Sequence, residues 1–284
     1  MIQNYLTVDI EDYYQVSAFE PLVGLAKWDR YPSRVVRNTR MLLNMLDGRG
    51  VKATFFVLAW VGERYPQLVK EIAANGHPIG CHSYQHRLIY TLSPDEFKED
   101  THRAKDILEQ ITGLRVTGYR APSYSITKHS LWAYDILEEL GFVFSSSVFP
   151  IYHDRYGMPD APRFAYRVPH HDLVEYPIST ARFLGYNIPV SGGGYFRLFP
   201  YAFARLALSR INNKEHQPFV FFIHPWEMDP DQPRIAHASL RSRLRHYSNL
   251  DKTKERFHKL LNEFSFIPVP ERQPIEVYRV NGAY

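Results

Sequence analysis

Short apolar runs alternate with amphipathic segments along the first half of the chain. The apolar runs are rich in β-branched and aromatic residues, are typical of buried strands, and span residues 5–10, 51–58, 78–81, 115–119 and 142–145. The segments between them carry apolar residues at helical spacing and predict helices over residues 33–47, 66–75, 93–112 and 129–140. This alternation is typical of an α/β fold with a largely parallel sheet.

Residues that begin and end helices agree with these boundaries. Ser33 precedes the first predicted helix as its cap, and Gly48 follows that helix. Ser93 and Glu96 form a capping-box pattern at the start of the longest predicted helix, and Gly113 ends it.

The pattern becomes less regular after residue 146. Residues 149–170 are rich in proline, tyrosine and charge, and residues 191–199 combine a glycine turn with an aromatic segment. Two further helices are predicted over residues 200–212 and 236–263, and residues 218–223 predict one more buried strand.

Length, composition and charge narrow the class of protein. A hydrophobic content of 45% and a charged content of 23% are ordinary for a soluble globular protein. Because no repeat or low-complexity linker divides the 284 residues, we expect one domain over residues 1–284, with an N-terminal half at 1–148 and a second half at 149–284. The net charge of +4 is mild, so we expect no nucleic-acid partner.

The cysteine content and the hydropathy of the chain indicate the cellular compartment of the protein. Cys81 is the single cysteine, which excludes an intrachain disulfide, and its apolar surroundings predict a buried side chain. Residues 1–12 lack a basic segment followed by a long apolar one, and no apolar run is long enough to span a membrane. We therefore expect a soluble, cytoplasmic protein without an integral membrane segment.

Two histidines follow the third predicted strand. His82 and His86 are four residues apart, so on a helical turn both imidazoles would face the same side and could reach one ion. Two imidazoles and one carboxylate bind zinc and related metals and leave a coordination position for a catalytic water. A zinc-protease helix is disfavoured, because Ser83 occupies the place of its glutamate base.

Polar side chains also follow three other predicted strands. The acidic segment 9–12 ends the first strand, Arg120 follows the fourth, and His224 follows the strand at 218–223. Parallel α/β folds place their chemistry at the carboxyl ends of the strands. The sequence therefore predicts that these groups meet His82 and His86 in one site.

These motifs resemble the polysaccharide deacetylases, the NodB-homology family of carbohydrate esterases, and within it the subgroup associated with exopolysaccharide and exosortase loci. The family resemblance rests on residues 53–57, 65–66, 76–77 and 82–86, on 120–122 and on His224. The subgroup resemblance rests on residues 9–13, 192–197 and 224–227. It implies an irregular (β/α) barrel of about seven strands with a family-specific C-terminal extension.

The resemblance also implies catalytic roles. Asp9 would be the general base with Arg120 as its ion-pair partner, and His224 would be the general acid. His82, His86 and a carboxylate would hold a divalent metal ion, zinc (Zn2+). The oxyanion would lie between the metal and a backbone N–H near Ser123.

The first motif departs from the family pattern, because Ile10 stands where a second aspartate is usual. Glu11 shares a face with Asp9 on a continuing strand, whereas Asp12 reaches the ion if the strand ends after Ile10, so both remain candidate ligands. The aspartate that tunes the acid histidine is also missing. Residues 145–147 are serines there, and the candidate substitutes are Glu175, Glu227 and Asp229.

The expected reaction is removal of N-acetyl groups from N-acetylhexosamine in an exopolysaccharide or its lipid-linked precursor, with peripheral association with a polysaccharide-synthesis machinery. Alternatives are hydrolysis of a small or cyclic amide and non-catalytic carbohydrate binding. Candidate substrate-binding residues are Ser123, Tyr124, Tyr195, Arg197 and Trp226.

Overall fold

The first strand, β1 (Gln3–Ile10), lies at the centre of the fold. A computed structural model describes residues 2–153 and 156–271 of the chain. In it, β1 pairs in parallel with β2 (Thr54–Val57) on one side and β10 (Val220–Ile223) on the other. Both faces of β1 are buried from Asn4 onward, which explains why its sequence is a nearly continuous apolar run.

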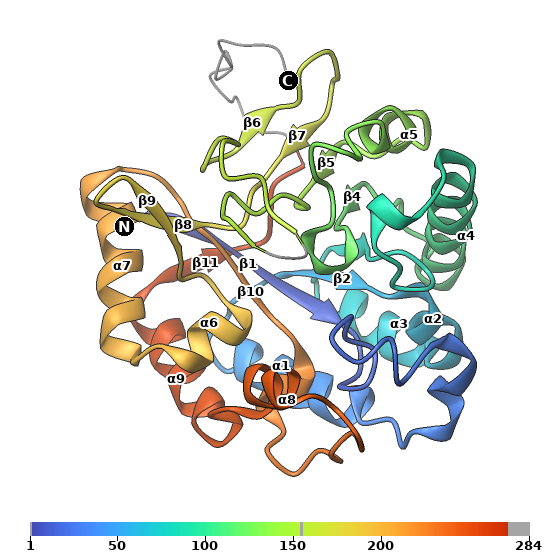
Figure 1. Ribbon diagram of the computed structural model, residues 1–284, viewed down its shortest axis with the longest axis horizontal. Helices are drawn as coiled ribbons and strands as arrows, with labels where there is room; N and C mark the ends of the chain where they lie inside the picture. Colours follow the sequence, from blue (N-terminus) through green and yellow to red (C-terminus); the bar gives the residue numbers. More distant parts are fainter. Residues whose placement is uncertain (1, 154–155, 272–284) are drawn as a thin grey trace.

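The sheet continues outward from β2 through four short parallel strands. In order these are β3 (Ile79–Cys81), β4 (Gly118–Tyr119), β5 (Phe144–Ser145) and β7 (Val174–Glu175). β6 (Tyr166–Arg167) joins β7 antiparallel, and β11 (Ser265–Ile267) pairs with the start of β1. Within the described residues, seven neighbouring strands are therefore parallel, and the sheet curls into a half-barrel (Figure 1). This confirms the predicted α/β barrel of NodB type.

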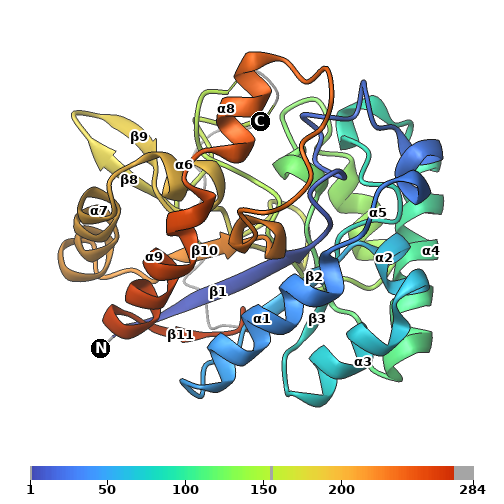
Figure 2. The same cartoon turned by 90° about the horizontal axis from the view of Figure 1, so that it is seen from below.

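Most of the helices lie around the outside of the sheet (Figures 1 and 2). The first half contributes α1 (Val35–Asp47), α2 (Ala59–Arg64), α3 (Pro66–Ala74), α4 (Pro94–Thr112) and α5 (Ala133–Glu139). The second half contributes α6 (Gly193–Leu198), α7 (Tyr201–Lys214), α8 (Leu240–Tyr247) and α9 (Leu250–Glu263). Residues of α6 and α8 line a cavity at the carboxyl ends of the strands. Short 3-10 helices are η1 (Leu25–Arg30), η2 (Ile89–Thr91), η3 (Pro122–Tyr124) and η4 (Pro225–Met228). No helix among the described residues has both the length and the apolar character needed to cross a membrane.

The predicted capping box at the start of α4 is confirmed. The Ser93 hydroxyl accepts a hydrogen bond from the backbone N–H of Glu96, and the Glu96 carboxylate accepts one from the N–H of Ser93. Gly113 ends the helix with a φ of 69°, a left-handed conformation that favours glycine.

Two predictions about the helices were wrong, and the short helix α2 was not predicted. Ser33 does not cap α1, because its hydroxyl donates to Asp12, whose carboxylate accepts the first helical N–H groups instead. The predicted helix over 236–263 is two helices, since Asn249 between α8 and α9 has a φ of 54°. The helix α2 was missed, because its six residues lack a full amphipathic repeat.

A hairpin stands apart from the main sheet in the second half. Its strands β8 (Thr180–Phe183) and β9 (Tyr186–Pro189) pair antiparallel, beside α7 (Figure 1). Leu184 and Gly185 form the two-residue turn, and both have positive φ, as tight hairpin turns require.

Candidate active site

The carboxyl ends of β1, β3, β4 and β10 meet around one cavity of about 420 Å³. Parallel strands bring residues from distant parts of the chain to the same edge of a sheet, so this clustering follows from the topology. The titratable groups on the cavity wall include Asp9, Glu11, His82, His86, His224 and His246. In the structure, the four strand-end motifs therefore lie together at one site.

Glu11, His82 and His86 form a cluster of the kind that binds a metal ion. One ligand atom from each lies within 4.8 Å of the others, and all three side chains are buried. His82 Nδ1 lies 2.8 Å from the carbonyl oxygen of Arg120. Because a carbonyl can only accept, Nδ1 carries the proton and Nε2 keeps its lone pair for a ligand. The donor set of two imidazoles and one carboxylate fits zinc.

The two histidines do not lie on a helical turn, contrary to the prediction. Ser83 has a φ of 62° and His86 a φ of 55°, so the segment is an irregular turn. The Asp100 carboxylate, on α4, accepts hydrogen bonds from the N–H groups of Tyr84 at 2.8 Å and Gln85 at 3.2 Å. This turn still holds the two imidazole rings 5.2 Å apart, within reach of one ion.

Glu11, and not Asp12, lies with the histidines. The Glu11 carboxylate is 2.7 Å from His86 Nε2. The Asp12 carboxylate points the other way and accepts hydrogen bonds from the Ser33 hydroxyl at 2.6 Å and from the N–H of Arg34 at 2.8 Å. Of the two candidate ligands, the geometry therefore favours Glu11, and Asp12 holds the N-terminus of α1.

Asp9 is fixed by a buried ion pair. Arg120 Nη1 lies 2.7 Å from Asp9 Oδ1, and neither side chain is more than 2% exposed. The same nitrogen donates to the Thr7 hydroxyl, and the other guanidinium nitrogens donate to the carbonyl and hydroxyl of Ser146. Because Arg120 has these further partners, it holds the Asp9 carboxylate in one orientation and balances its charge.

His224 is oriented by a neighbouring carboxylate. Its Nδ1 lies 2.7 Å from Glu227 Oε1, and Arg197 Nε donates to Glu227 Oε2 at 2.7 Å. Its Nε2 faces the cavity, 3.8 Å from Asp9 and 3.6 Å from Glu11. Of the three carboxylates considered as its partner, Glu227 is the one in contact.

The other two carboxylates have different partners. Glu175 accepts hydrogen bonds from the N–H groups of Ser147 and Val148. Asp229 pairs with Arg34 at 3.3 Å. Each of them therefore supports a loop or helix, and among the described residues neither is a hydrogen-bond partner of His224.

Burial and neighbouring charges shift the pKa values of this cluster. Burial alone would raise the pKa of Glu11, but the charges of His86, His224 and His82 outweigh it and lower the pKa to about 2. Burial lowers the pKa of His82 to about 4, which keeps the imidazole in its neutral, metal-binding form. Burial also opposes a charge on His224, but its hydrogen bond to Glu227 and the acidic groups around it raise its pKa to about 9.

The predicted substrate-binding residues differ in how much they can touch a ligand. Tyr195 is partly exposed on the cavity wall. Ser123 has a φ of 51° and its hydroxyl lies 2.8 Å from that of Ser17, while the Tyr124 hydroxyl is 3.5 Å from Asp9. These residues line the cavity, as predicted.

Arg197 and Trp226 also border the cavity but are almost completely buried. The Arg197 guanidinium donates to Glu227 and to three backbone carbonyls at the end of α8. Trp226 Nε1 donates to Glu11 at 3.2 Å, and its ring is stacked between His224 and His246. Both residues are therefore placed to orient the reacting groups more than to contact a sugar.

Sequence reasoning missed Asp100, Ser146, Ser17 and His246. Each reaches the site through contacts between residues far apart in the chain, which spacing in a sequence does not reveal. His246 is buried against Trp226, and its Nε2 lies 2.8 Å from Gln232 Oε1. Burial lowers its pKa well below the usual value, so it is a neutral packing partner of the tryptophan.

Two family models match consecutive parts of the chain. Residues 23–144 match the model described as polysaccharide deacetylase, and residues 146–272 match one described as a domain of unknown function (DUF3473). A peptidoglycan-N-acetylglucosamine deacetylase from Bacillus cereus is 35% identical over 96 residues, which cover 34% of this chain and 35% of that protein. The chain thus spans about a third of the length of this curated relative.

Solved structures with the same fold include a putative polysaccharide deacetylase from Mycobacterium smegmatis. It has a TM-score of 0.55 and 20% identity, and the match covers 96% of both chains. A variant of a CE4 family pseudoenzyme from Bacillus anthracis has a TM-score of 0.50 and 15% identity, over 94% of this chain and 65% of that one. The first half of the chain is therefore similar to polysaccharide deacetylases (CE4, NodB-like), and the described residues share the fold of these solved structures.

Proposed function

We propose that this protein is a metal-dependent hydrolase that removes N-acetyl groups from N-acetylhexosamine units of a glycan. One observation carries the proposal: a carboxylate base, a three-ligand metal cluster and an acid histidine all face one cavity. They are the pair Asp9–Arg120, the cluster Glu11–His82–His86 and the pair His224–Glu227. This combination suits amide hydrolysis, because water must lose a proton, the leaving amine must gain one, and a metal ion would polarise the carbonyl.

The chain's own residues account for both proton transfers. Asp9 accepts the proton of the attacking water, and the ion pair with Arg120 holds its carboxylate in place at the cavity. His224 is held protonated by Glu227 and donates from Nε2 to the leaving nitrogen. Zinc bound by Glu11, His82 and His86 would supply Lewis acidity to the acetamido carbonyl and to the water.

We further propose that residues 1–284 act as one domain. β1, which precedes the first matched region, pairs with β2 of that region and with β10 and β11 of the second, and His224 comes from the second. The proposed substrate is an exopolysaccharide or its lipid-linked precursor, with the protein in the cytoplasm and peripherally associated with the synthesis machinery. The subgroup motifs at residues 9–13, 192–197 and 224–227 support this choice.

A direct test combines metal analysis with acetate release from N-acetylglucosamine oligomers. We expect about one metal ion per chain and acetate release by the wild type, and loss of acetate release in Asp9→Asn and His86→Ala. His129→Ala, at an exposed histidine outside the cavity, is the matched control. Retained activity in both site variants would refute the mechanism. Binding of oligomers without acetate release by the metal-loaded wild type would favour a non-catalytic role.

A further inference from the structure

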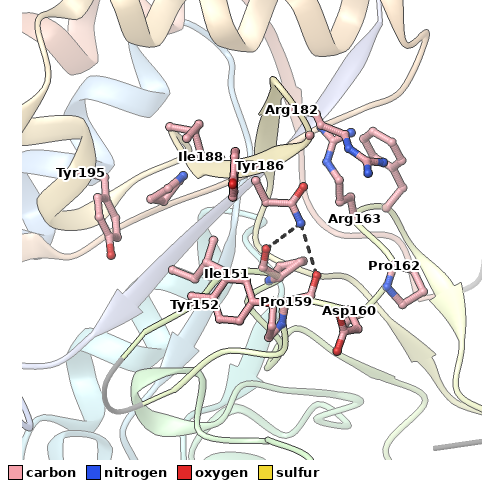
Figure 3. A pocket seen from close by; sticks show the side chains of 16 residues that line it. Ile151, Tyr152, Pro159, Asp160, Pro162, Arg163, Arg182, Tyr186, Ile188 and Tyr195 are labelled. Atoms are coloured by element: carbon pink, nitrogen blue, oxygen red, sulfur yellow. Dashed lines mark hydrogen bonds between the residues drawn. The ribbon is translucent and has the colours of Figure 1, made fainter.

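A second cavity, of about 860 Å³, opens beside the candidate active site. Figure 3 shows its two walls. Tyr186 and Ile188, on the β8–β9 hairpin, form one wall, and Ile151, Tyr152 and Pro159, from the loop after β5, form the other. We call it the hairpin cavity. None of the catalytic groups named above lines it.

The walls of the hairpin cavity are held together by specific contacts. Asn187 on β9 donates to the carbonyl oxygens of Pro150 at 2.9 Å and Pro159 at 3.5 Å, drawn as dashed lines in Figure 3. Arg163 donates to the carbonyl of Thr180 on β8 and forms an ion pair with Glu215. Because the hairpin is attached to the loop at two places, the cavity is a built feature of the fold.

Two aromatic rings on the cavity lining are unusually exposed. Tyr152 is 83% exposed and Tyr186 is 69% exposed, and they come from opposite walls. An isolated exposed aromatic residue needs no explanation, but two on one concave surface mark a binding site. Their flat faces suit the C–H faces of sugar rings, and their hydroxyls add hydrogen bonds at the edges.

The charges of the lining favour an uncharged ligand. Arg163 is neutralised by Glu215, and Asp160 by Lys128 at 2.8 Å. Arg182 is exposed and adds hydrogen-bond donors suited to hydroxyl groups. This small net charge argues against a phosphate-rich ligand and for a neutral glycan.

Tyr195 connects the two cavities. This residue of α6 lines the hairpin cavity and also the candidate active site. A ligand chain that has one unit in the active site can therefore continue past Tyr195 into the hairpin cavity. A single acetylated sugar has no need of the second cavity, whereas a polymer does.

We propose that the hairpin cavity binds sugar units of the same neutral N-acetylhexosamine chain whose acetamide enters the candidate active site. Tyr152 and Tyr186 are its stacking platforms. This inference rests on the proposed function and extends it, because it makes the substrate an oligosaccharide or polymer and not a single sugar or small amide.

The test compares N-acetylglucosamine dimers and hexamers as substrates. In the wild type, kcat/KM for the hexamer should exceed that for the dimer by roughly 10- to 100-fold, the gain expected from two aromatic contacts. In the double variant Tyr152→Ala/Tyr186→Ala, this ratio should fall toward one, mainly through a higher KM for the hexamer. Leu184→Ala is the matched control, because Leu184 is 97% exposed on the same hairpin but outside the cavity lining.

Calorimetric titration with the hexamer gives a readout that needs no turnover. If the double variant binds the hexamer more weakly and Leu184→Ala binds it as the wild type does, glycan binding in the hairpin cavity is supported. This holds even if no acetate is released, and in that case only the proposed reaction fails. Equal affinity and an equal hexamer-to-dimer ratio in the double variant and the wild type overturn the inference. So does a wild type that neither binds the hexamer nor prefers it to the dimer.

Discussion

Replacement of Glu227 by glutamine tests the acid side of the proposed mechanism. Glu227 Oε1 accepts from His224 Nδ1 at 2.7 Å, and the substitution removes its negative charge while it nearly preserves its shape. Opposite charges whose centres lie roughly 4 Å apart attract by about 4 kcal/mol at an effective dielectric constant near 20. That energy corresponds to a factor of about 10³ in rate if it is lost from the protonated histidine.

We therefore expect Glu227→Gln to lower kcat by about 10²- to 10³-fold. The metal content should be unchanged, because Glu227 is not part of the cluster of Glu11, His82 and His86. The assay is steady-state acetate release, with metal analysis and a thermal melt of the same preparation. Asp229→Asn is the matched control, since Asp229 is equally buried and ion-paired but contacts Arg34 in place of His224. A kcat within about threefold of wild type, or an equal loss in the control, would refute the reasoning.

Three further predictions concern other parts of the structure. Glu11→Gln should lose bound metal, whereas Asp12→Asn should keep it, as metal analysis would show. Asp12→Asn should instead lower the free energy of unfolding by about 1–2 kcal/mol, measured by urea unfolding, because it weakens the hydrogen bonds at the start of α1. Burial lowers the pKa of His77 to about 4. Between pH 6.5 and 4 the unfolded chain therefore takes up a proton that the folded chain resists, and the free energy of unfolding should fall by roughly 2–3 kcal/mol. His77→Asn should abolish this share of the pH dependence. Gly192→Ala should destabilise the fold by more than about 2 kcal/mol, because the φ of Gly192 is 133° and a Cβ there would lie 2.1 Å from a backbone oxygen. Gly194→Ala is the control. It should cost less than half as much, because no atom lies within 3.4 Å of the added Cβ.

The arrangement of strands was predictable because it depends on local pattern. Each apolar run at residues 5–10, 51–58 and 218–223 overlaps an observed strand, and parallel pairing brings the carboxyl ends of these strands together. The chemical groups at those ends were visible in the sequence for the same reason. Hydrophobic periodicity can be recognised within a short segment of sequence, and parallel pairing places the carboxyl ends of separate strands at one edge of the sheet.

What the sequence did not predict depends on contacts across the fold. The conformation of His82 and His86 is set by Asp100, a residue of α4 that accepts two N–H groups of their turn. The choice between Glu11 and Asp12 depends on where α1 begins in space, because its first N–H groups bind the Asp12 carboxylate. Neither contact has a signature in residue spacing, so the strand periodicity that slightly favoured Glu11 could not decide between the two carboxylates.

The region that matches the domain of unknown function, residues 146–272, completes the candidate site. It supplies His224, the Glu227–Arg197 pair that orients His224, and the Trp226 indole that donates to Glu11. The same indole stacks on His224, so one residue touches both the metal cluster and the acid histidine. Residues 23–144 contain the imidazoles and Arg120, but not the proposed acid. Arg197, Trp226 and His246 are buried as one stacked, hydrogen-bonded unit, so a change in packing behind Trp226 would alter the metal cluster and the acid histidine together.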